Sequence, residues 1–264
     1  MKAKAQELRS KSYRGTALRD SRGIYTWGAK DERFPSVTAI LGGMAKPALT
    51  YWAAKSVAEY VANYVGTTVP DEKIRWAEVQ EHLSNVEELK SVPWKYAEKR
   101  RDLGSTFHDI AERFAGGMEV NPAVFASDIR PLVESFLRWV DENQPEWVAM
   151  EAGVFNREHN YAGTMDTILE WRGRTVVLDY KSSKDSYPEH ALQLAAYRNA
   201  EFLGLADGTE IPMPKTDGGI ILLVREEGCK ALEWPSGPEQ FDAFLALRKL
   251  YTFSKSNIKF QEIA

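Results

Sequence analysis

The fold is decided by residues 163–181, GTMDTILEWRGRTVVLDYK, which have the pattern of two strands joined by a tight turn. Apolar and β-branched residues fill both arms, and Arg172-Gly173 between them is typical of a two-residue hairpin turn. Counting back along both arms from such a turn places Asp166 directly opposite Asp179. The stretch therefore predicts an antiparallel pair that carries two carboxylates on one face.

Two aspartates opposite each other in a sheet have Cβ atoms about 5 Å apart and repel unless their charge is compensated. A hard divalent cation provides that compensation beside an open groove. Lys181 lies two residues after Asp179 and therefore on the same face. A lysine there can orient or deprotonate an attacking water and stabilise charge on phosphorus, which indicates phosphodiester hydrolysis. Taken alone, an Asp-x-Lys at a strand end is more often an exposed ion pair.

Outward from this hairpin, the chain is helix-rich up to about residue 144 and then alternates between strands and helices. After a helix over 127–143 the pattern predicts strands at 147–155, 163–171 and 174–181, a helix at 188–203, strands at 218–224 and 229–234, and a helix at 238–251. The order helix, three strands, helix, strand predicts an α/β fold with a central mixed sheet flanked by helices.

The N-terminal half is expected to be a helical elaboration of this core. Ser36 is a good N-cap for a helix that contains Val37, Ile40 and Leu41, and a second helix is expected after Pro47. A further helix over 103–115 places His108 beside its apolar face.

Four short motifs in chain order resemble the RecB-like branch of the PD-(D/E)xK nucleases, which includes phage-type exonucleases. The resemblance covers about residues 100–200, and the SVTAIL stretch at 36–41 also looks like phage-type members. The motifs are GSTFH at 104–108, GTMD at 163–166, LDYK at 178–181 and QLAAY at 193–197.

The resemblance implies a restriction-endonuclease-like core and a metal-dependent active site that uses Mg²⁺ or Mn²⁺. Position by position, Asp166 and Asp179 would bind the metal and Lys181 would be catalytic. His108 would be a further ligand, and the main-chain carbonyl of Tyr180 could also coordinate.

Other residues are expected around this centre. Gln193 and Tyr197 match a motif whose residues contact DNA in that branch. Arg100 and Arg101 could follow a DNA backbone, although a solvated helix face is their simpler interpretation.

Two further carboxylates are candidates for the second shell. Glu112 could orient His108, since metal-bound imidazoles usually donate their other N–H to a carboxylate or carbonyl, but a surface i,i+4 pair is as good an explanation. Glu151 could add a carboxylate from the preceding strand, with an exposed strand glutamate as the simpler alternative.

Composition limits the alternatives. The chain has 264 residues, a net charge of −4 and one cysteine, Cys229, which cannot hold a four-cysteine iron–sulfur cluster or a thiolate zinc site. The chain thus resembles a cluster-free relative of the CRISPR adaptation nucleases. No apolar run approaches a membrane span, so we expect a cytoplasmic protein that does not bind membranes. The resemblance to phage-type nucleases implies a bacterial or phage origin.

We expect a basic N-terminal arm over residues 1–23, with a transit peptide as the alternative, and one nuclease domain over 24–264. Within it, 24–100 would be helical and 101–264 would form the catalytic core.

The expected function is a DNA nuclease, preferentially an exonuclease, in recombination, repair or phage DNA processing. A nuclease-fold module that binds DNA with weak or no catalysis beside a partner helicase or recombinase is the first alternative. A metal enzyme acting on a small phosphorylated substrate is the second. Exonuclease or endonuclease action, an oligomeric state and a single-strand-binding protein as partner stay open.

Overall fold

The computed structural model describes residues 18–44, 46–68, 81–205 and 207–257. They belong to two compact units, one within residues 45–106 and the other comprising the rest of the chain. Most of the predicted N-terminal arm, residues 1–17, lies outside the described residues.

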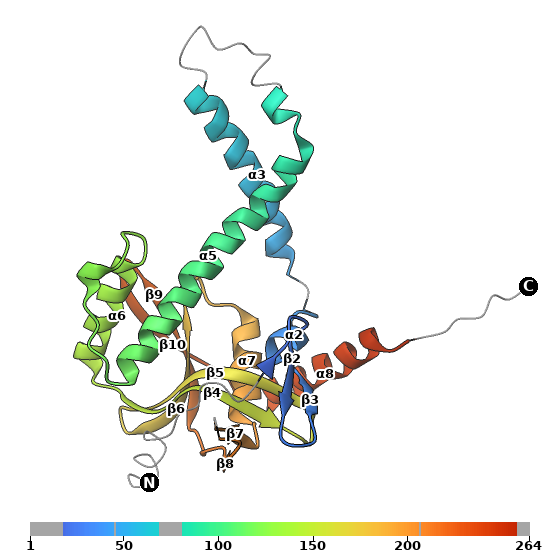
Figure 1. Cartoon of the computed structure of the whole chain (residues 1–264), viewed down its shortest axis with the longest axis vertical. Helices are drawn as coiled ribbons and strands as arrows, with labels where there is room; N and C mark the ends of the chain where they lie inside the picture. The colour runs from blue at the N-terminus through green and yellow to red at the C-terminus, as the bar shows by residue number, and fades with distance from the viewer. Residues whose placement is uncertain (1–17, 45, 69–80, 206, 258–264) are drawn as a thin grey trace, which may run out of the picture. The chain divides into compact units, whose positions relative to one another are not determined.

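The larger unit contains a seven-stranded sheet in the order β10-β9-β6-β5-β4-β7-β8 (Figure 1). Neighbouring strands are antiparallel except β6 and β9, which are parallel, so the sheet is mixed. The strands are β4 (Glu146–Asn156), β5 (Tyr161–Trp171), β6 (Arg174–Lys181), β7 (Phe202–Gly204), β8 (Glu210–Pro212), β9 (Gly218–Arg225) and β10 (Gly228–Trp234).

Helices cover both faces of this sheet. Tyr180 of β6 packs edge-on against Phe136 of α6, whereas Val177 of β6 shares a core with Leu194 of α7. Because alternate residues of a strand face opposite sides, α6 and α7 lie on opposite faces. The predicted α/β class and the order of helix, three strands and helix are therefore observed. The helices of this part are α2 (Val37–Leu41), α6 (Arg130–Asn143), α7 (Pro188–Arg198) and α8 (Pro238–Lys255), with a 3₁₀ turn, η1, at Pro122–Val124.

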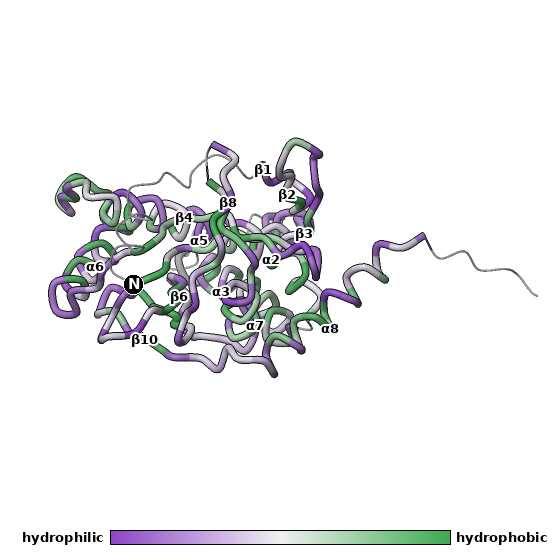
Figure 2. Tube along the Cα trace, turned by 90° about the horizontal axis from the view of Figure 1, so that it is seen from below, coloured by the Kyte–Doolittle hydropathy of each residue, from purple (hydrophilic) through white to green (hydrophobic). Residues whose placement is uncertain are grey.

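The predicted hairpin forms with its expected turn. Trp171 pairs with Arg174, and the two turn residues have positive φ, 52° for Arg172 and 74° for Gly173. Positive φ at both central positions is the property of a type I′ turn, whose twist matches that of the strands it joins. Figure 2 shows the hydrophobic stretches along sheet strands such as β4.

The N-terminal region is not purely helical, which corrects the prediction for residues 24–100. Strands β1 (Leu18–Arg19), β2 (Ile24–Trp27) and β3 (Glu32–Pro35) form a small antiparallel sheet. Burial alternates along β2, with Tyr25 and Trp27 inside. This period of two specifies a strand, because Trp27 must pack on Phe155 of β4, 4.8 Å away between ring centroids.

The helix predicted over 188–203 ends earlier than expected. α7 stops at Arg198, and residues 202–204 form β7 along the edge of β4. Phe202 is stacked on Phe155 with ring centroids 5.1 Å apart. The apolar burial of this aromatic in the sheet favours a strand over a further helical turn.

The smaller unit is helical. It contains α3 (Pro47–Thr68) and most of α5 (Val86–Ala115), which begins well before the predicted residue 103. Tyr60 of α3 joins them, since its hydroxyl lies 3.0 Å from both His82 Nε2 and Glu88 Oε1. Within the described ranges, no helix combines the length and apolarity needed to cross a membrane.

Candidate functional site

Three acidic side chains come from three neighbouring strands of the sheet. Glu151 lies on β4, Asp166 on β5 and Asp179 on β6. Asp166 is 9% exposed and Asp179 only 1%. Burial of this much negative charge costs free energy unless cations or hydrogen-bond donors compensate it, so their partners define what the site can do.

The register between β5 and β6 is the predicted one along the whole of their ladder, from Trp171 opposite Arg174 onward. The ladder ends at Thr167 opposite Leu178, one residue before Asp166 and Asp179. At this point a side-chain oxygen takes the place of a main-chain acceptor, because the Tyr180 N–H donates to Asp166 Oδ2 at 2.7 Å. β6 continues instead along β9, where Asp179 pairs with Ile221. The main-chain pairing of β5 and β6 therefore ends beside the two carboxylates.

A possible metal-ligand set is centred on Asp166. His108 Nδ1 lies 3.3 Å from Asp166 Oδ1. His108, Glu151 and Asp166 each offer one ligand atom, and these atoms lie within 4.8 Å of one another. Two carboxylates with one imidazole suit a divalent cation such as Mn²⁺, and the carboxylates suit Mg²⁺. The donor set therefore fits the expected Mg²⁺ or Mn²⁺.

Glu151 was expected in the second shell, but the structure brings its carboxylate into this set. It has φ of 44°, a left-handed conformation that is unfavourable for a non-glycine residue inside a strand. The neighbouring pairs Met150 with Thr167 and Ala152 with Met165 put Glu151 level with Asp166. The sequence could have indicated this position of Glu151, because counting back along both strands from the short loop between β4 and β5 also puts Glu151 opposite Asp166.

Asp179 has different partners. Lys181 forms an ion pair with Asp179 Oδ2, and Gln193 Nε2 donates to Asp179 Oδ1 at 3.0 Å. The same Gln193 nitrogen donates to the Tyr197 hydroxyl at 3.0 Å. Among the described residues, Asp179 Oδ2 has no hydrogen bond besides its ion-pair contact. A buried carboxylate oxygen with one contact retains capacity for another ligand.

Gln193 and Tyr197 were predicted to contact DNA, and that role stays a prediction, but both also support Asp179. Gln193 is 8% exposed and Tyr197 only 2%. Their hydrogen bonds fix the orientation of Asp179, so the structure makes them positioning residues. Burial raises the pKa of Tyr197 far above its ordinary value, with the charge of Asp179 acting in the same direction.

Gly163, the first residue of the GTMD motif, is required by this packing. A Cβ at position 163 would lie 2.6 Å from Tyr197 Cε1 and 3.4 Å from Val37 Cγ2. The tyrosine ring can approach β5 only because the glycine has no side chain. The GTMD motif therefore contributes the carboxylate of Asp166 and, through Gly163, the space for Tyr197, whose hydroxyl accepts from the Gln193 amide that holds Asp179.

The pKa values of His108 and Asp166 shift as an ion pair. Burial acts to lower the pKa of His108, but the charge and hydrogen bond of Asp166 raise it to about 9. Burial likewise acts to raise the pKa of Asp166, and the charge and hydrogen bond of His108 reverse this and lower it. Without metal, the pair is therefore an imidazolium beside a carboxylate.

The pKa of Asp179 shifts in the opposite direction to that of Asp166. Burial raises its pKa to about 6, although the charge of Lys181 acts to lower it. Burial acts to lower the pKa of Lys181, but the charges of Asp179 and Asp166 raise it overall. Lys181 is thus held as an ammonium in contact with Asp179 and within the field of Asp166.

Glu112 and Tyr180 lie at the edge of the Asp166 side. Glu112, one turn after His108, lines a small recess with His108, Glu151 and Asp166. The Tyr180 ring packs against Phe136 and is nearly fully buried. Its N–H serves Asp166, and the role of its carbonyl as a metal ligand stays a prediction.

Arg100 and Arg101 are exposed on the part of α5 that belongs to the smaller unit. Their predicted role in DNA binding stays a prediction. The only cysteine of the chain, Cys229, is on β10 and lies 3.4 Å from the hydroxyl of Ser135. A four-cysteine cluster within one chain is excluded by this count.

Comparisons with known proteins add little. No family model matches the chain, and no curated protein matches it. Among solved structures, "Crystal structure of SSO0001" is similar at 15% sequence identity, over 80% of this chain and 88% of that chain, with a TM-score of 0.33. A similarity at this level does not establish a shared fold or a shared function.

Proposed function

We propose that the protein is a metal-dependent deoxyribonuclease that uses Mg²⁺ or Mn²⁺ and acts as an exonuclease. The observation that carries this proposal is a row of three acidic residues on neighbouring strands, Glu151, Asp166 and Asp179, which we call the acidic row. His108, Glu151 and Asp166 offer ligand atoms within 4.8 Å of one another. Asp179 and Lys181 complete the row from the next strand. Burying several acidic residues together lowers the stability of the folded protein unless a cation compensates their charge, so such a group indicates a cation-binding function.

His108, Glu151 and Asp166 would hold the metal, with Asp179 completing the set. A bound divalent cation would polarise the phosphodiester and lower the pKa of an attacking water. The protein's own contribution is electrostatic. Lys181 is held as an ammonium by Asp179 and Asp166, so it is suited to stabilise negative charge that develops on the phosphoryl oxygens.

Orientation of Asp179 comes from outside the acidic row. Gln193 donates to one oxygen of Asp179, while Lys181 contacts the other. Such outer partners fix the direction of a ligand and commonly contribute about 10–100-fold to metal affinity or activity. The choice of DNA as substrate rests on the four motifs that resemble RecB-like nucleases and on the exposed Arg100 and Arg101.

The test is digestion of end-labelled linear DNA and closed circular DNA, single- and double-stranded, with Mg²⁺, Mn²⁺ or EDTA. Wild-type protein is compared with Asp179→Ala and Lys181→Ala. Lys230→Ala, an exposed position on β10, is the matched control for loss of a lysine. We expect metal-dependent loss of linear DNA by wild type and control only. Cleavage of circles would make the enzyme an endonuclease.

A second candidate has its own observation. Each of the two buried aspartates already has a cationic partner, Asp166 with His108 and Asp179 with Lys181. The row can thus be nearly charge-balanced without metal, as a DNA-binding module without catalysis would require. Tight DNA binding with no cleavage by wild type in either metal would favour this candidate and contradict the nuclease.

A further inference from the structure

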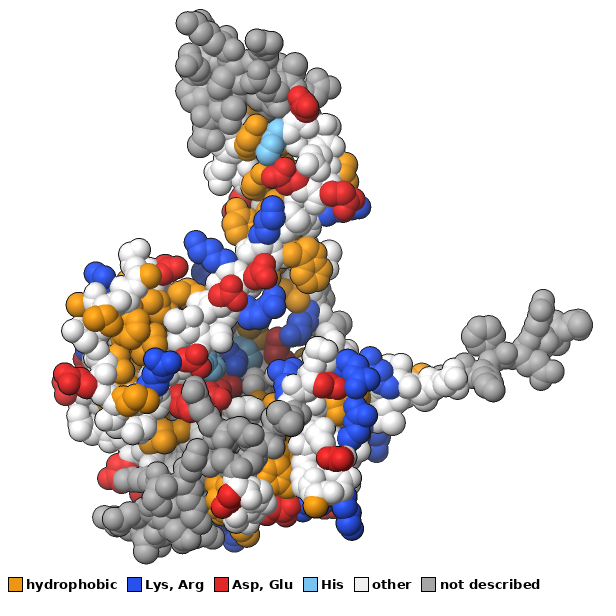
Figure 3. All heavy atoms as spheres, in the orientation of Figure 1, with side chains coloured by type: hydrophobic (Ala, Val, Ile, Leu, Met, Phe, Trp, Pro, Cys, Tyr) orange, Lys and Arg blue, Asp and Glu red, His pale blue; other side chains and the backbone are white. Residues whose placement is uncertain are grey.

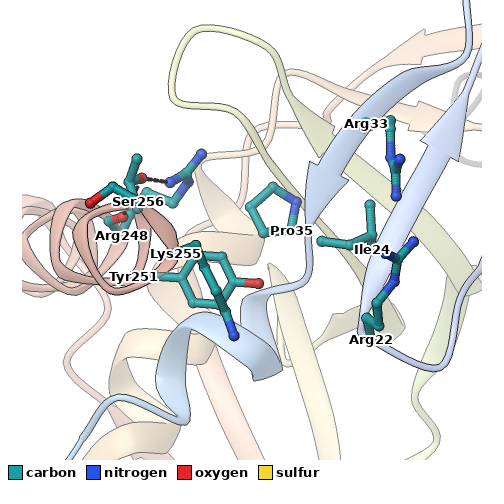
Figure 4. A pocket seen from close by; sticks show the side chains of 9 residues that line it. Arg22, Ile24, Arg33, Pro35, Arg248, Tyr251, Lys255 and Ser256 are labelled. Carbon is teal, nitrogen blue, oxygen red and sulfur yellow. Dashed lines mark hydrogen bonds between the residues drawn. The ribbon is translucent and has the colours of Figure 1, made fainter. Parts of the chain in front are cut away.

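A cationic pocket lies between the small N-terminal sheet and α8, within the larger unit. Arg22 and Arg33 come from the β2–β3 side, and Arg248 and Lys255 come from α8. Figure 4 shows the two groups on either side of Pro35. The pocket has a volume of about 540 Å³, which is within the range of small-ligand sites.

The charge of this pocket is not balanced by its own residues. Asp20 pairs with Arg22 at 2.8 Å and more distantly with Arg33 at 3.7 Å. Within the described ranges, Arg248 and Lys255 have no carboxylate at ion-pair distance. Four cations against one carboxylate leave an excess of three positive charges, in a chain whose net charge is −4. Figure 3 shows Lys and Arg side chains gathered over β3 and α8.

Arg248 is the strongest sign of an anionic ligand. Its side chain is half-buried, and burial lowers its pKa. Its guanidinium donates to the main-chain oxygen of Asn160 at 2.8 Å and to the Thr252 hydroxyl. These partners are neutral, so they orient the guanidinium without compensating its charge. An oriented and uncompensated arginine is typical of phosphate recognition.

The floor of the pocket is apolar. Ile24 and Pro35 supply it from the strands, and Tyr251 supplies a half-buried ring from α8. Lys255 Nζ lies 5.7 Å from the centre of that ring. Cations beside an aromatic and apolar floor are the combination that binds single-stranded nucleic acid, whose phosphates pair with Lys and Arg while its bases contact flat rings.

We propose that the pocket between β2–β3 and α8 binds a single-stranded nucleic acid segment, with its backbone phosphates held by Arg33, Arg248 and Lys255. This inference rests on the proposed nuclease function and adds to it a second contact for the strand, built from residues outside the acidic row.

The test measures binding separately from cleavage. A fluorescein-labelled oligothymidylate of about 20 nucleotides, which exceeds the usual site size of one binding module, is titrated with protein in EDTA while anisotropy is followed over a range of salt concentrations. The pocket variant is Arg33→Glu with Lys255→Glu, two exposed positions. The control is Lys215→Glu with Lys230→Glu, also exposed and equal in charge change, but away from the pocket.

We expect the pocket variant to bind at least about tenfold more weakly at low salt. The slope of log K against log salt concentration should fall by about 1.4, because each lost phosphate contact on a single strand removes about 0.7. The control should stay within about twofold of wild type. Thermal melting of all variants checks that they are folded.

The other outcomes separate the two proposals. Equal binding by the pocket and control variants would overturn the pocket and leave the nuclease intact. Pocket-dependent binding without cleavage by wild type would support the pocket and overturn the nuclease. Absence of both binding and cleavage would overturn both. Displacement of the oligonucleotide by polyglutamate as readily as by unlabelled DNA of equal charge would identify an acidic protein as the ligand and overturn the nucleic acid assignment.

Discussion

Asp166 and Asp179 lie on adjacent strands and are both buried, but their pKa values move in opposite directions. Asp166 is paired with an imidazolium and accepts a main-chain N–H, and its pKa is lowered. Asp179 is held by a neutral amide and one ammonium, and its pKa is raised to about 6. The difference shows that the partners of Asp166 outweigh the effect of its burial, whereas at Asp179 burial outweighs the charge of Lys181, which leaves Asp166 as the stronger acid and the readier cation ligand.

The largest expected effect is on the stabilisation of the protein by Mn²⁺, which should depend more on Asp166 than on Asp179. Mn²⁺ at a hundredfold excess over its Kd should stabilise wild type by about 2.7 kcal/mol, or roughly 5–10 °C in Tm. Asp166→Asn should abolish this shift because Asp166 belongs to the set with His108 and Glu151. Asp179→Asn should retain part of it. Thermal melting with and without Mn²⁺ measures both variants, and equal loss in the two would contradict the comparison.

The next effect disturbs only the Asp179 side. Gly163→Ala places a methyl group 2.6 Å from Tyr197 Cε1, and overpacking of this kind costs about 1–3 kcal/mol. We expect Tm to fall by roughly 2–12 °C. Gly116→Ala, where a Cβ has more space at 3.3 Å, is the control. The double variant with Tyr197→Leu should recover much of the loss, and an absence of coupling would show that the contact is not the cause.

The pH dependence tests the Asp166 side in metal-free protein. The pKa of folded His108 is about 9, above its ordinary value of 6.5. A raised pKa contributes stability that is complete below pH 6.5 and is lost as pH rises to about 9. The Tm of wild type should therefore fall relative to His108→Gln across this window, by roughly 2–4 °C for each kcal/mol lost. Parallel melting curves in EDTA at both ends of the window would contradict the ion pair.

The smallest effect is expected from Tyr197→Phe. The variant removes the hydroxyl that accepts from Gln193 but leaves the bond from Gln193 to Asp179 in place. A single hydrogen bond of this kind contributes about 0.5–1.5 kcal/mol. Chemical denaturation measures the loss, and Leu194→Ala in the same helix, fully buried, provides the scale of a large effect. A loss as large as that of Leu194→Ala would mean that Tyr197 does more than position Gln193.

Much of the architecture could be predicted because it follows from local patterns. The Arg172-Gly173 turn and the alternation along Val176 to Lys181 gave β6 its observed bounds and the correct pairing at the turn. Tyr25 and Trp27 alternate in the same way, but β2 has only four residues, and an alternation of two buried side chains is too short to indicate a strand by itself. The early end of α7 is set by the packing of Phe202 on Phe155, which is a tertiary contact.

The site could be predicted only in part. Spacing predicted Asp166, Asp179 and Lys181 but not the place of Glu151 beside Asp166, and the ladder stops before Asp166 because its side chain accepts the Tyr180 N–H. The alternation of apolar and polar residues does not predict this hydrogen bond from a main-chain N–H to a side chain of the neighbouring strand. The positioning role of Gln193 and Tyr197 depends on how α7 packs over β6, so sequence motifs could identify the residues without identifying what they contact.

The parallel pairing of β6 with β9 has a kinetic consequence. β4, β5 and β6 are joined by short connections, so the strands that carry Glu151, Asp166 and Asp179 can pair early. β9 pairs with β6 only after the intervening segment, which includes α7, has crossed back over the sheet. Distant pairings of this kind are slow because loop closure precedes the gain from contact. In pulse-labelling hydrogen exchange during refolding, amides of the β4–β5 ladder should therefore become protected before those of β9.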